Sequence, residues 1–358
     1  MKKLGIVTII DNNNYGNRLQ NYATQTILNK MGIENNTILN TVTFNTKKRY
    51  LLKKLKYFNQ DLYCTDSKNF GRKNAFDQFN QNISFDNKKY TIYSKFHYEW
   101  LLVGSDQVWN PFLGRLNDMD LLNIKNVKKI ALSASFGINA LPESINKEKI
   151  SKCLNEFKGI SVRETEGKQI LTQIGLEKDI QVLVDPTLLL TDDEWDKVAK
   201  KPPMLRSKKY ILNYFLGNLS EERKKEIDRI AQENDCEVIN ILDKNSEFYE
   251  CGPSEFLYLE KHAFLVCTDS FHSSVFAIIY NRPFIVFDRE EKGLISMSSR
   301  LNTLISKLKL QNREYNGKSI TDLNLNHDYS SAYEQLKYER AKAIEFISNT
   351  IRGEIHEI

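Results

Sequence analysis

The chain has 358 residues, 41% of them hydrophobic and 27% charged, which is typical of a soluble globular protein too long for a single ordinary domain. Its net charge of +5 falls short of the dense basic patch of a nucleic-acid binder, and no apolar stretch approaches the roughly 20 residues of a membrane span. The five cysteines are scattered without CxxC spacing, which argues against a disulfide framework or a zinc site and favours a reducing cytoplasm.

The first half of the chain alternates short apolar strands with amphipathic helices. The apolar run over residues 4–10 stops at Asp11 with no small-residue cleavage site, so we expect a buried strand and no signal peptide. Apolar residues then recur at helical spacing from Leu19 to Met31, and Gly32 ends that helix. Further strands are predicted at residues 99–103, 129–135, 160–162 and 180–184, with further helices after residues 162 and 191.

The same alternation resumes after residues 200–209, a stretch of prolines and basic residues that is the best candidate for a linker. Strands are predicted at residues 210–215, 237–241, 264–267 and 284–287, and helices at 221–234, 255–262, 270–280 and 332–351. Near-continuous apolar strands between helices indicate parallel sheets that are covered on both faces.

We therefore expect an α/β protein of two Rossmann-like, doubly wound domains that face a cleft. The first domain is predicted to span residues 1–200 and to be completed by a C-terminal helix at 330–358, and the second to span residues 201–329. Ligands bind at the carboxyl ends of the strands in such folds, so polar residues that directly follow a strand are the candidates for a site.

The first candidate segment is the loop "DNNNYGN" after the first strand. It contains neither GxGxxG nor GxxxxGK[ST], which excludes a dinucleotide fingerprint and a P-loop. Asn14, Tyr15 and Asn17 stand at a helix start, where amides and Asn side chains can hold an anion or a sugar hydroxyl. The alternative is ordinary turn chemistry, in which Asn and Gly adopt left-handed dihedral angles.

The second candidate segment is "GSDQVWNP", which follows an apolar strand. Ser105, Asp106 and Gln107 supply polar groups for hydroxyls, and Trp109 offers a ring face for C–H bonds, a combination typical of carbohydrate binding. Trp109 could equally be a core residue. The polar cluster at the end of a strand favours the functional interpretation.

The third candidate is Arg163, which lies between the strand at 160–162 and the helix that follows. A guanidinium at this edge suits a carboxylate or a phosphate, since it can donate two parallel hydrogen bonds. The alternative is an ordinary ion pair with Glu164 or Glu166.

The fourth candidate segment is "LVCTDSFHSSVF", in which Asp269, Ser270, His272 and Ser273 stand where a strand passes into a helix. Here the alternative is a helix N-cap, with Asp269 or Ser270 accepting hydrogen bonds from helix amides. Lys292 comes 20 residues after His272 (292 − 272), one strand further on, so both can face one cleft. Otherwise Lys292, like Arg300, has the character of a surface charge.

Taken together, these segments resemble the polysaccharide pyruvyl transferase family. The segments "NNYGNRLQNYA", "VGSDQVWNP", "SVRE", "DPTLLL" and "TDSFHSSVFAIIYNRPF" occur in the order typical of the family and cover most of the chain. The resemblance implies a fold similar to GT-B glycosyltransferases and transfer of the enolpyruvyl group of phosphoenolpyruvate onto a sugar of a bacterial surface polysaccharide, usually as a cyclic ketal. Phosphoenolpyruvate is the donor substrate, and no other cofactor or metal is expected.

By the same resemblance, Arg163, His272 and Lys292 are expected to bind phosphoenolpyruvate. Ser270 and Ser273, which stand beside His272 at the helix start, are expected to bind it too. The family often has Gly after the His, where this chain has Ser273. His272 is the expected acid or base, and Asp106 a second catalytic group. The residues expected to bind the acceptor are Asn14, Tyr15, Asn17, Ser105, Asp106, Gln107, Trp109 and Asp269.

The acceptor is expected to be a lipid-linked or nucleotide-linked sugar, which would bring a cytoplasmic enzyme to the inner face of the cell membrane. No nucleic-acid partner is expected. Two alternatives are a nucleotide-sugar-dependent glycosyltransferase with the same architecture and a family member that only binds glycans or partners. Fold alone does not exclude the first, since one fold hosts many functions.

Overall fold

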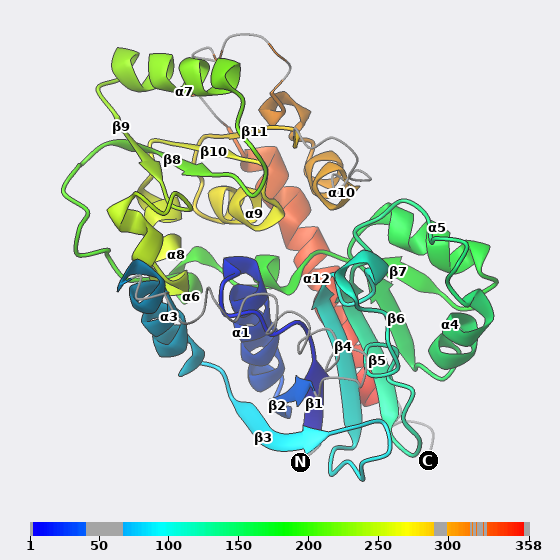
Figure 1. Ribbon diagram of the computed structural model, residues 1–358. Helices are drawn as coiled ribbons and strands as arrows, with labels where there is room; N and C mark the ends of the chain where they lie inside the picture. The colour runs from blue at the N-terminus through cyan, green and yellow to red at the C-terminus, as the bar shows by residue number, and fades with distance from the viewer. Residues whose placement is uncertain are drawn as a thin grey trace.

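The computed structural model describes residues 3–40, 67–289, 299–315, 317, 320, 325 and 328–353. Two parallel sheets follow one another along the chain, and Figure 1 shows the second sheet above the first. The first has seven strands in the order β3-β2-β1-β4-β5-β6-β7, and the second has four in the order β11-β10-β8-β9. Every pairing between these strands is parallel, which confirms the predicted α/β fold class.

The elements of the first sheet and its helices come from the N-terminal half. The strands are β1 (Lys3–Val7), β2 (Glu34–Asn40), β3 (Phe85–Tyr90), β4 (Trp100–Asp106), β5 (Lys128–Ala134), β6 (Gly159–Val162) and β7 (Ile180–Val182). The helices are α1 (Tyr15–Lys30), α3 (Ser67–Asn80), α4 (Lys147–Leu154), α5 (Thr165–Gln173) and α6 (Asp192–Asp196), with short 3₁₀ turns η1 (Pro111–Leu113) and η2 (Pro186–Leu189).

The second sheet is built from the following part of the chain. The strands are β8 (Tyr210–Tyr214), β9 (Glu237–Asn240), β10 (Leu265–Thr268) and β11 (Phe284–Val286). The helices are α7 (Glu221–Glu233), α8 (Pro253–His262), α9 (Phe271–Ile279), α10 (Ser299–Lys307) and α12 (Ser330–Arg352), with 3₁₀ turns η3 (Glu247–Glu250) and η4 (Gln311–Arg313). No helix among the described residues is both long enough and apolar enough to cross a membrane.

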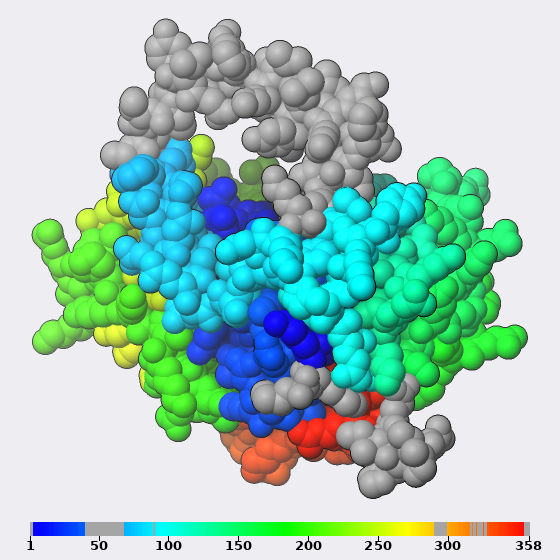
Figure 2. All heavy atoms as spheres, turned by 90° about the horizontal axis from the view of Figure 1, so that it is seen from below, coloured from blue at the N-terminus to red at the C-terminus, as the bar shows by residue number. Residues whose placement is uncertain are grey.

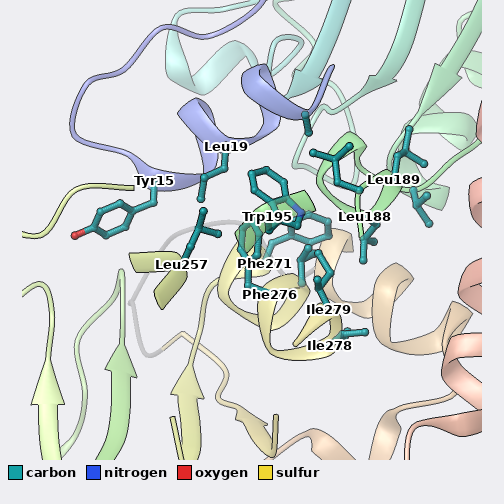
Figure 3. Close-up of a cluster of buried hydrophobic side chains, with 14 of the residues drawn as sticks. Tyr15, Leu19, Leu188, Leu189, Trp195, Leu257, Phe271, Phe276, Ile278 and Ile279 are labelled. Carbon is teal, nitrogen blue, oxygen red and sulfur yellow. The ribbon is translucent and has the colours of Figure 1, made fainter. Parts of the chain in front are cut away.

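One apolar core connects the two halves. Every residue of α9 is buried, and the Phe276 ring meets Trp195 edge-on at 5.0 Å. Figure 3 shows the labelled members of this cluster, which are Tyr15, Leu19, Leu188, Leu189, Trp195, Leu257, Phe271, Phe276, Ile278 and Ile279. Burying each large apolar side chain contributes about 1.5–3 kcal/mol, so this contact holds the two sheets in a fixed relation.

The closing helix α12 also contacts both halves, and Figure 1 shows it running back from the second sheet to the first. Arg340 donates to the carbonyl oxygens of Leu188 (2.5 Å) and Leu190 (2.9 Å), and Tyr333 donates to that of Ile278 (2.7 Å). The predicted helix at 332–351 is thus confirmed. The predicted domain limits stay a prediction, since α12 packs on both halves.

Strands β2 and β3 and helices α3, α4 and α10 were not predicted. β2 reads "ENNTILN", and Asn is depleted in strands. Its packing against α1 depends on polar side chains, since Asn21 and Gln25 both donate to Thr37 Oγ1, at 2.7 and 2.9 Å. β3 is the edge strand that pairs with β2, and Figure 2 shows cyan residues of this part of the chain at the surface of the molecule.

Candidate active site

A cavity of about 400 Å³ lies between the sheets, where β1, β4, β8 and β10 end. This is the edge at which open α/β folds bind ligands, and the volume is that of a small-molecule site. Its acidic and basic lining residues are Asp11, Asp106, Arg115, His272, Arg289 and Arg300. A wider groove of about 920 Å³ beside β7 and α12 shares none of its lining residues.

Arg163 is enclosed beneath this cavity. Its Nη1 donates to Asp185 Oδ2 (2.7 Å) and its Nη2 to Asp106 Oδ1 (3.2 Å). The Phe271 ring covers the guanidinium at 4.5 Å, and 1% of the side chain is exposed. The ion-pair alternative is therefore correct in kind, but the partners are two aspartates and not Glu164 or Glu166.

Asp185 is a site residue that sequence reasoning missed. It accepts hydrogen bonds from Ser105 Oγ (2.5 Å) and from the Thr187 amide (3.0 Å) and hydroxyl (2.7 Å). Burial alone would raise its pKa, but the facing Arg163, with smaller contributions from His272 and these hydrogen bonds, lowers the pKa to about 2. The signal was present in "VDPTLLL", where the Asp follows a strand, but we used "DPTLLL" only for the family resemblance and assigned Asp185 no role.

Asp106 carries a carboxylate at the wall of the cavity. Its backbone has φ of 68°, an uncommon left-handed conformation for a non-glycine residue. Asn17 donates to Oδ2 and the Gln107 amide donates to Oδ1 (2.8 Å). Burial would raise the pKa of Asp106, but Arg163, His272 and Arg300 together keep it below its usual value, so the group is ionised at neutral pH.

His272, in the first turn of α9, faces the cavity from the second half of the chain. Its Nε2 lies 3.9 Å from Asp185 Oδ2 and has no hydrogen-bond partner among the described residues. Burial lowers the pKa of His272 although Asp185 and Asp106 oppose the shift. At pH 7 the imidazole is therefore neutral, and its buried Nε2 has a hydrogen-bonding capacity that no described residue uses.

The alternative that makes Arg300 an ordinary surface charge is wrong. It is buried near the start of α10 and lines the cavity, 3.9 Å from Asp106 Oδ1. With its oxygen turned to the guanidinium, the Gln107 carboxamide accepts from Arg300 at 3.0 and 3.2 Å. Burial, with the neighbouring Arg163, lowers the pKa of Arg300 to about 10, which still leaves it charged at neutral pH.

Six of the predicted residues line the cavity: Asn14, Asn17, Asp106, Gln107, Ser270 and His272. Asn14 also caps α1 by accepting from the Asn17 amide (3.2 Å). The turn alternative is wrong, because Asn14 has an extended backbone with φ of −110° and Gly16 has no positive φ. The cap alternative for α9 was wrong, because Ser270 makes no side-chain cap bond and Asp269 accepts from the Leu216 and Gly217 amides instead (2.7 and 2.8 Å). Asp269 fixes the end of β8 and does not line the cavity.

The predicted contacts of Tyr15 and Trp109 with an acceptor are wrong, because both side chains are fully buried. The Tyr15 hydroxyl donates to the Cys251 carbonyl (2.8 Å), which joins the start of α1 to the second half. Trp109 donates from Nε1 to the Asp120 carbonyl (3.0 Å) and packs on Phe136. Trp109 is thus a core residue, as the alternative interpretation held.

Neither Ser105 nor Ser273 reaches the cavity, which corrects two further expectations. The Ser105 hydroxyl donates its hydrogen bond to Asp185, and Ser273 Oγ donates to the buried Glu260 at 2.5 Å. Both residues are fully buried. Lys292 lies outside the described residues, so its predicted role stays a prediction.

Comparison with known proteins gives one family. The family model described as polysaccharide pyruvyl transferase matches residues 14–291, which is most of the chain. A search of the curated proteins finds no match.

Comparison with solved structures gives the fold. A putative UDP-N-acetylglucosamine 2-epimerase from Listeria monocytogenes aligns with a TM-score of 0.54 at 13% identity, over 100% of this chain and 98% of that one. UDP-GlcNAc 2-epimerase from Neisseria meningitidis bound to UDP-GlcNAc gives 0.51 at 11% identity, over 98% and 99%. MurG from Acinetobacter baumannii gives 0.39 at 9% identity, over 99% and 100%. The likeness to the two epimerases concerns the fold alone, and it agrees with the predicted GT-B-like architecture.

Proposed function

The chain belongs to the polysaccharide pyruvyl transferase family, and from that membership we propose that it moves the enolpyruvyl group of phosphoenolpyruvate onto a sugar as a pyruvate ketal. The acceptor is a surface polysaccharide or its lipid-linked precursor, and the reaction takes place at the cytoplasmic face of the membrane. One observation carries this proposal: a neutral imidazole, whose buried Nε2 has no hydrogen-bond partner among the described residues, lines one cavity with an ionised carboxylate and a buried guanidinium.

The chemistry requires two proton movements. As a sugar hydroxyl adds to the enol carbon, the methylene group gains a proton and becomes a methyl group. A second hydroxyl then replaces phosphate through an oxocarbenium-like state, so one hydroxyl proton ends on the methyl carbon and the other on the released phosphate. A positioned acid or base contributes about 10²–10⁴-fold to such a reaction.

His272 is the group that we assign to these proton movements, and Asp106 is the group that orients the reacting hydroxyl. The neutral His272 Nε2 takes the proton of an attacking hydroxyl, and the Asp185 carboxylate 3.9 Å away stabilises the resulting imidazolium. Asp106, fixed by Asn17 and Gln107, accepts a hydrogen bond from the acceptor hydroxyl and orients it. Cationic side chains compensate the charge of the donor, with Lys292 a further proposed contact.

The test is incubation of the full chain with phosphoenolpyruvate and candidate acceptor sugars. We expect release of inorganic phosphate together with a gain of pyruvate mass on the acceptor, and loss of both in His272→Asn. Absence of phosphate release with every acceptor, combined with no heat of phosphoenolpyruvate binding in calorimetry, would contradict the proposal. Thermal stabilisation by nucleoside diphosphates but not by phosphoenolpyruvate would favour a nucleotide-sugar glycosyltransferase instead.

A further inference from the structure

The guanidinium of Arg163 is already compensated by protein. Two carboxylates, Asp106 and Asp185, lie at 3.2 and 2.7 Å, so the three buried groups together carry net negative charge. The Phe271 ring, which lines the cavity, covers the guanidinium at 4.5 Å. The Phe271 ring therefore separates an anionic ligand in the cavity from this guanidinium, and the two carboxylates already accept hydrogen bonds from both of its Nη groups and repel an anion.

Arg300 has the opposite surroundings. It lines the cavity, and its nearest carboxylate oxygen in the described part of the chain is 3.9 Å away, beyond hydrogen-bond distance. Its Nε is buried with no hydrogen-bond partner among the described residues. Burying a guanidinium without close compensation is costly, and an anion in the cavity would remove that cost.

The other arginines on the cavity wall differ from Arg300 in this respect. Arg115 is paired with the buried Asp120, and Arg289 Nε lies 3.1 Å from Asp269 Oδ2. Among these three, Arg300 is therefore the side chain whose charge the described protein leaves least compensated. It also lies beyond residues 14–291, so the family match assigns it no role.

We infer that Arg300 is the direct guanidinium ligand of the anionic donor, and that Arg163 is a positioning residue that holds Asp106 and Asp185. The inference rests on the proposed function, because the donor is the phosphorylated carboxylate named there. Arg300 donates hydrogen bonds to the phosphate or the carboxylate of the donor, beside Asp106. The Gln107 carboxamide oxygen holds the guanidinium in place by accepting two hydrogen bonds from it. The donor bound by Arg300 then lies next to Asp106, the residue that orients the acceptor hydroxyl.

The experiment is calorimetric titration of the full chain with phosphoenolpyruvate, inorganic phosphate and pyruvate, each against wild type, Arg300→Ala, Arg300→Lys and Arg163→Lys. Arg300→Ala is expected to weaken phosphoenolpyruvate binding by roughly 10- to 100-fold, the range of a charged hydrogen bond. Arg300→Lys restores part of the loss, and Arg163→Lys changes affinity less than Arg300→Ala does. Arg206→Ala, at an exposed position, is the matched control and leaves affinity unchanged.

The outcomes separate the inference from the proposed function. Wild type that binds phosphoenolpyruvate, with Arg300→Ala binding equally well, overturns the role of Arg300 and leaves the function standing. Wild type that binds phosphate but not phosphoenolpyruvate, with phosphate binding lost in Arg300→Ala, supports the anion ligand and contradicts the function. If wild type binds none of the three probes, both fail.

Discussion

At the scale of single residues, the position of His272 depends on a glycine from the other half of the chain. A Cβ added at Gly16, in the first turn of α1, would lie 2.0 Å from His272 Nδ1. Such a contact is far inside van der Waals distance, so any side chain at position 16 requires the imidazole to move. The Gly of "NNYGN", to which the turn alternative gave a left-handed turn, instead makes room for the proposed base.

Gly16→Ala is therefore expected to lower kcat more than it weakens donor binding. A displacement of about 1 Å in a reacting group can cost roughly 10²-fold in rate. Steady-state kinetics and calorimetry on the same preparation check this. Gly353→Ala is the matched control, since an added Cβ there meets no atom within 4 Å. Equal kcat in Gly16→Ala and wild type would show that the imidazole position does not matter.

The lowered pKa of His272 sets the pH dependence. Since burial depresses the pKa, the neutral base is present above its usual value of 6.5 and is lost as pH falls through the lower folded-state value. We expect kcat/KM to fall on the acid side with an apparent pKa below 6.5. A pH–rate profile of wild type and His272→Asn measures this, and the variant should lack that limb. A limb that persists unchanged in the variant assigns the titration to another group.

At the scale of elements, the site exists because parallel strands end at one edge. Asp106 is the last residue of β4, Arg163 directly follows β6, and Asp185 follows β7. Two carboxylates and one guanidinium from separate strands thus meet in the interior. Removing the central partner of a buried ionic group leaves uncompensated charge, which is strongly destabilising.

Arg163→Ala is expected to destabilise the fold by about 3–5 kcal/mol at pH 7, because it leaves Asp106 and Asp185 buried without their guanidinium. The deficit should shrink as pH falls, since the variant can protonate these carboxylates and wild type holds Asp185 ionised down to a pKa of about 2. Urea denaturation at pH 7.5 and pH 5 measures both effects. An equal deficit at the two pH values would contradict the electrostatic cause.

The sequence predicted strands and helices wherever apolar periodicity was strong, as at β1, β4, β8 and β10. It did not predict β2, because this strand is bound to α1 by hydrogen bonds from Asn21 and Gln25, and such bonds leave no hydrophobic periodicity in the sequence. The sequence identified candidate site residues from their position at strand ends, but it did not predict which residues their side chains contact. Asp185 and Arg300 acquire their roles from partners far away along the chain, and Tyr15 and Trp109 turned inward where polar neighbours faced the cavity.

At the scale of the whole molecule, the two sheets share one core and α12 binds to both halves. We therefore expect cooperative unfolding in a single calorimetric transition, which two independent domains would not give. Arg340→Ala removes two hydrogen bonds from a charged donor to the Leu188 and Leu190 carbonyls and should destabilise the fold by about 1.5–3 kcal/mol. Differential scanning calorimetry tests this, and two resolved transitions in wild type would refute the coupling.

The return of α12 to the first sheet also bears on how the protein matures in the cell. Between Leu189 in η2 and Arg352 at the end of α12 lie 163 residues (352 − 189), which a ribosome adds in roughly 8–30 s at ~5–20 residues per second. During that interval the apolar surface that α12 later covers stays open on the nascent chain. We therefore expect chaperones to bind the nascent chain at this stage and C-terminally shortened products to aggregate, because both expose the apolar surface on which α12 docks.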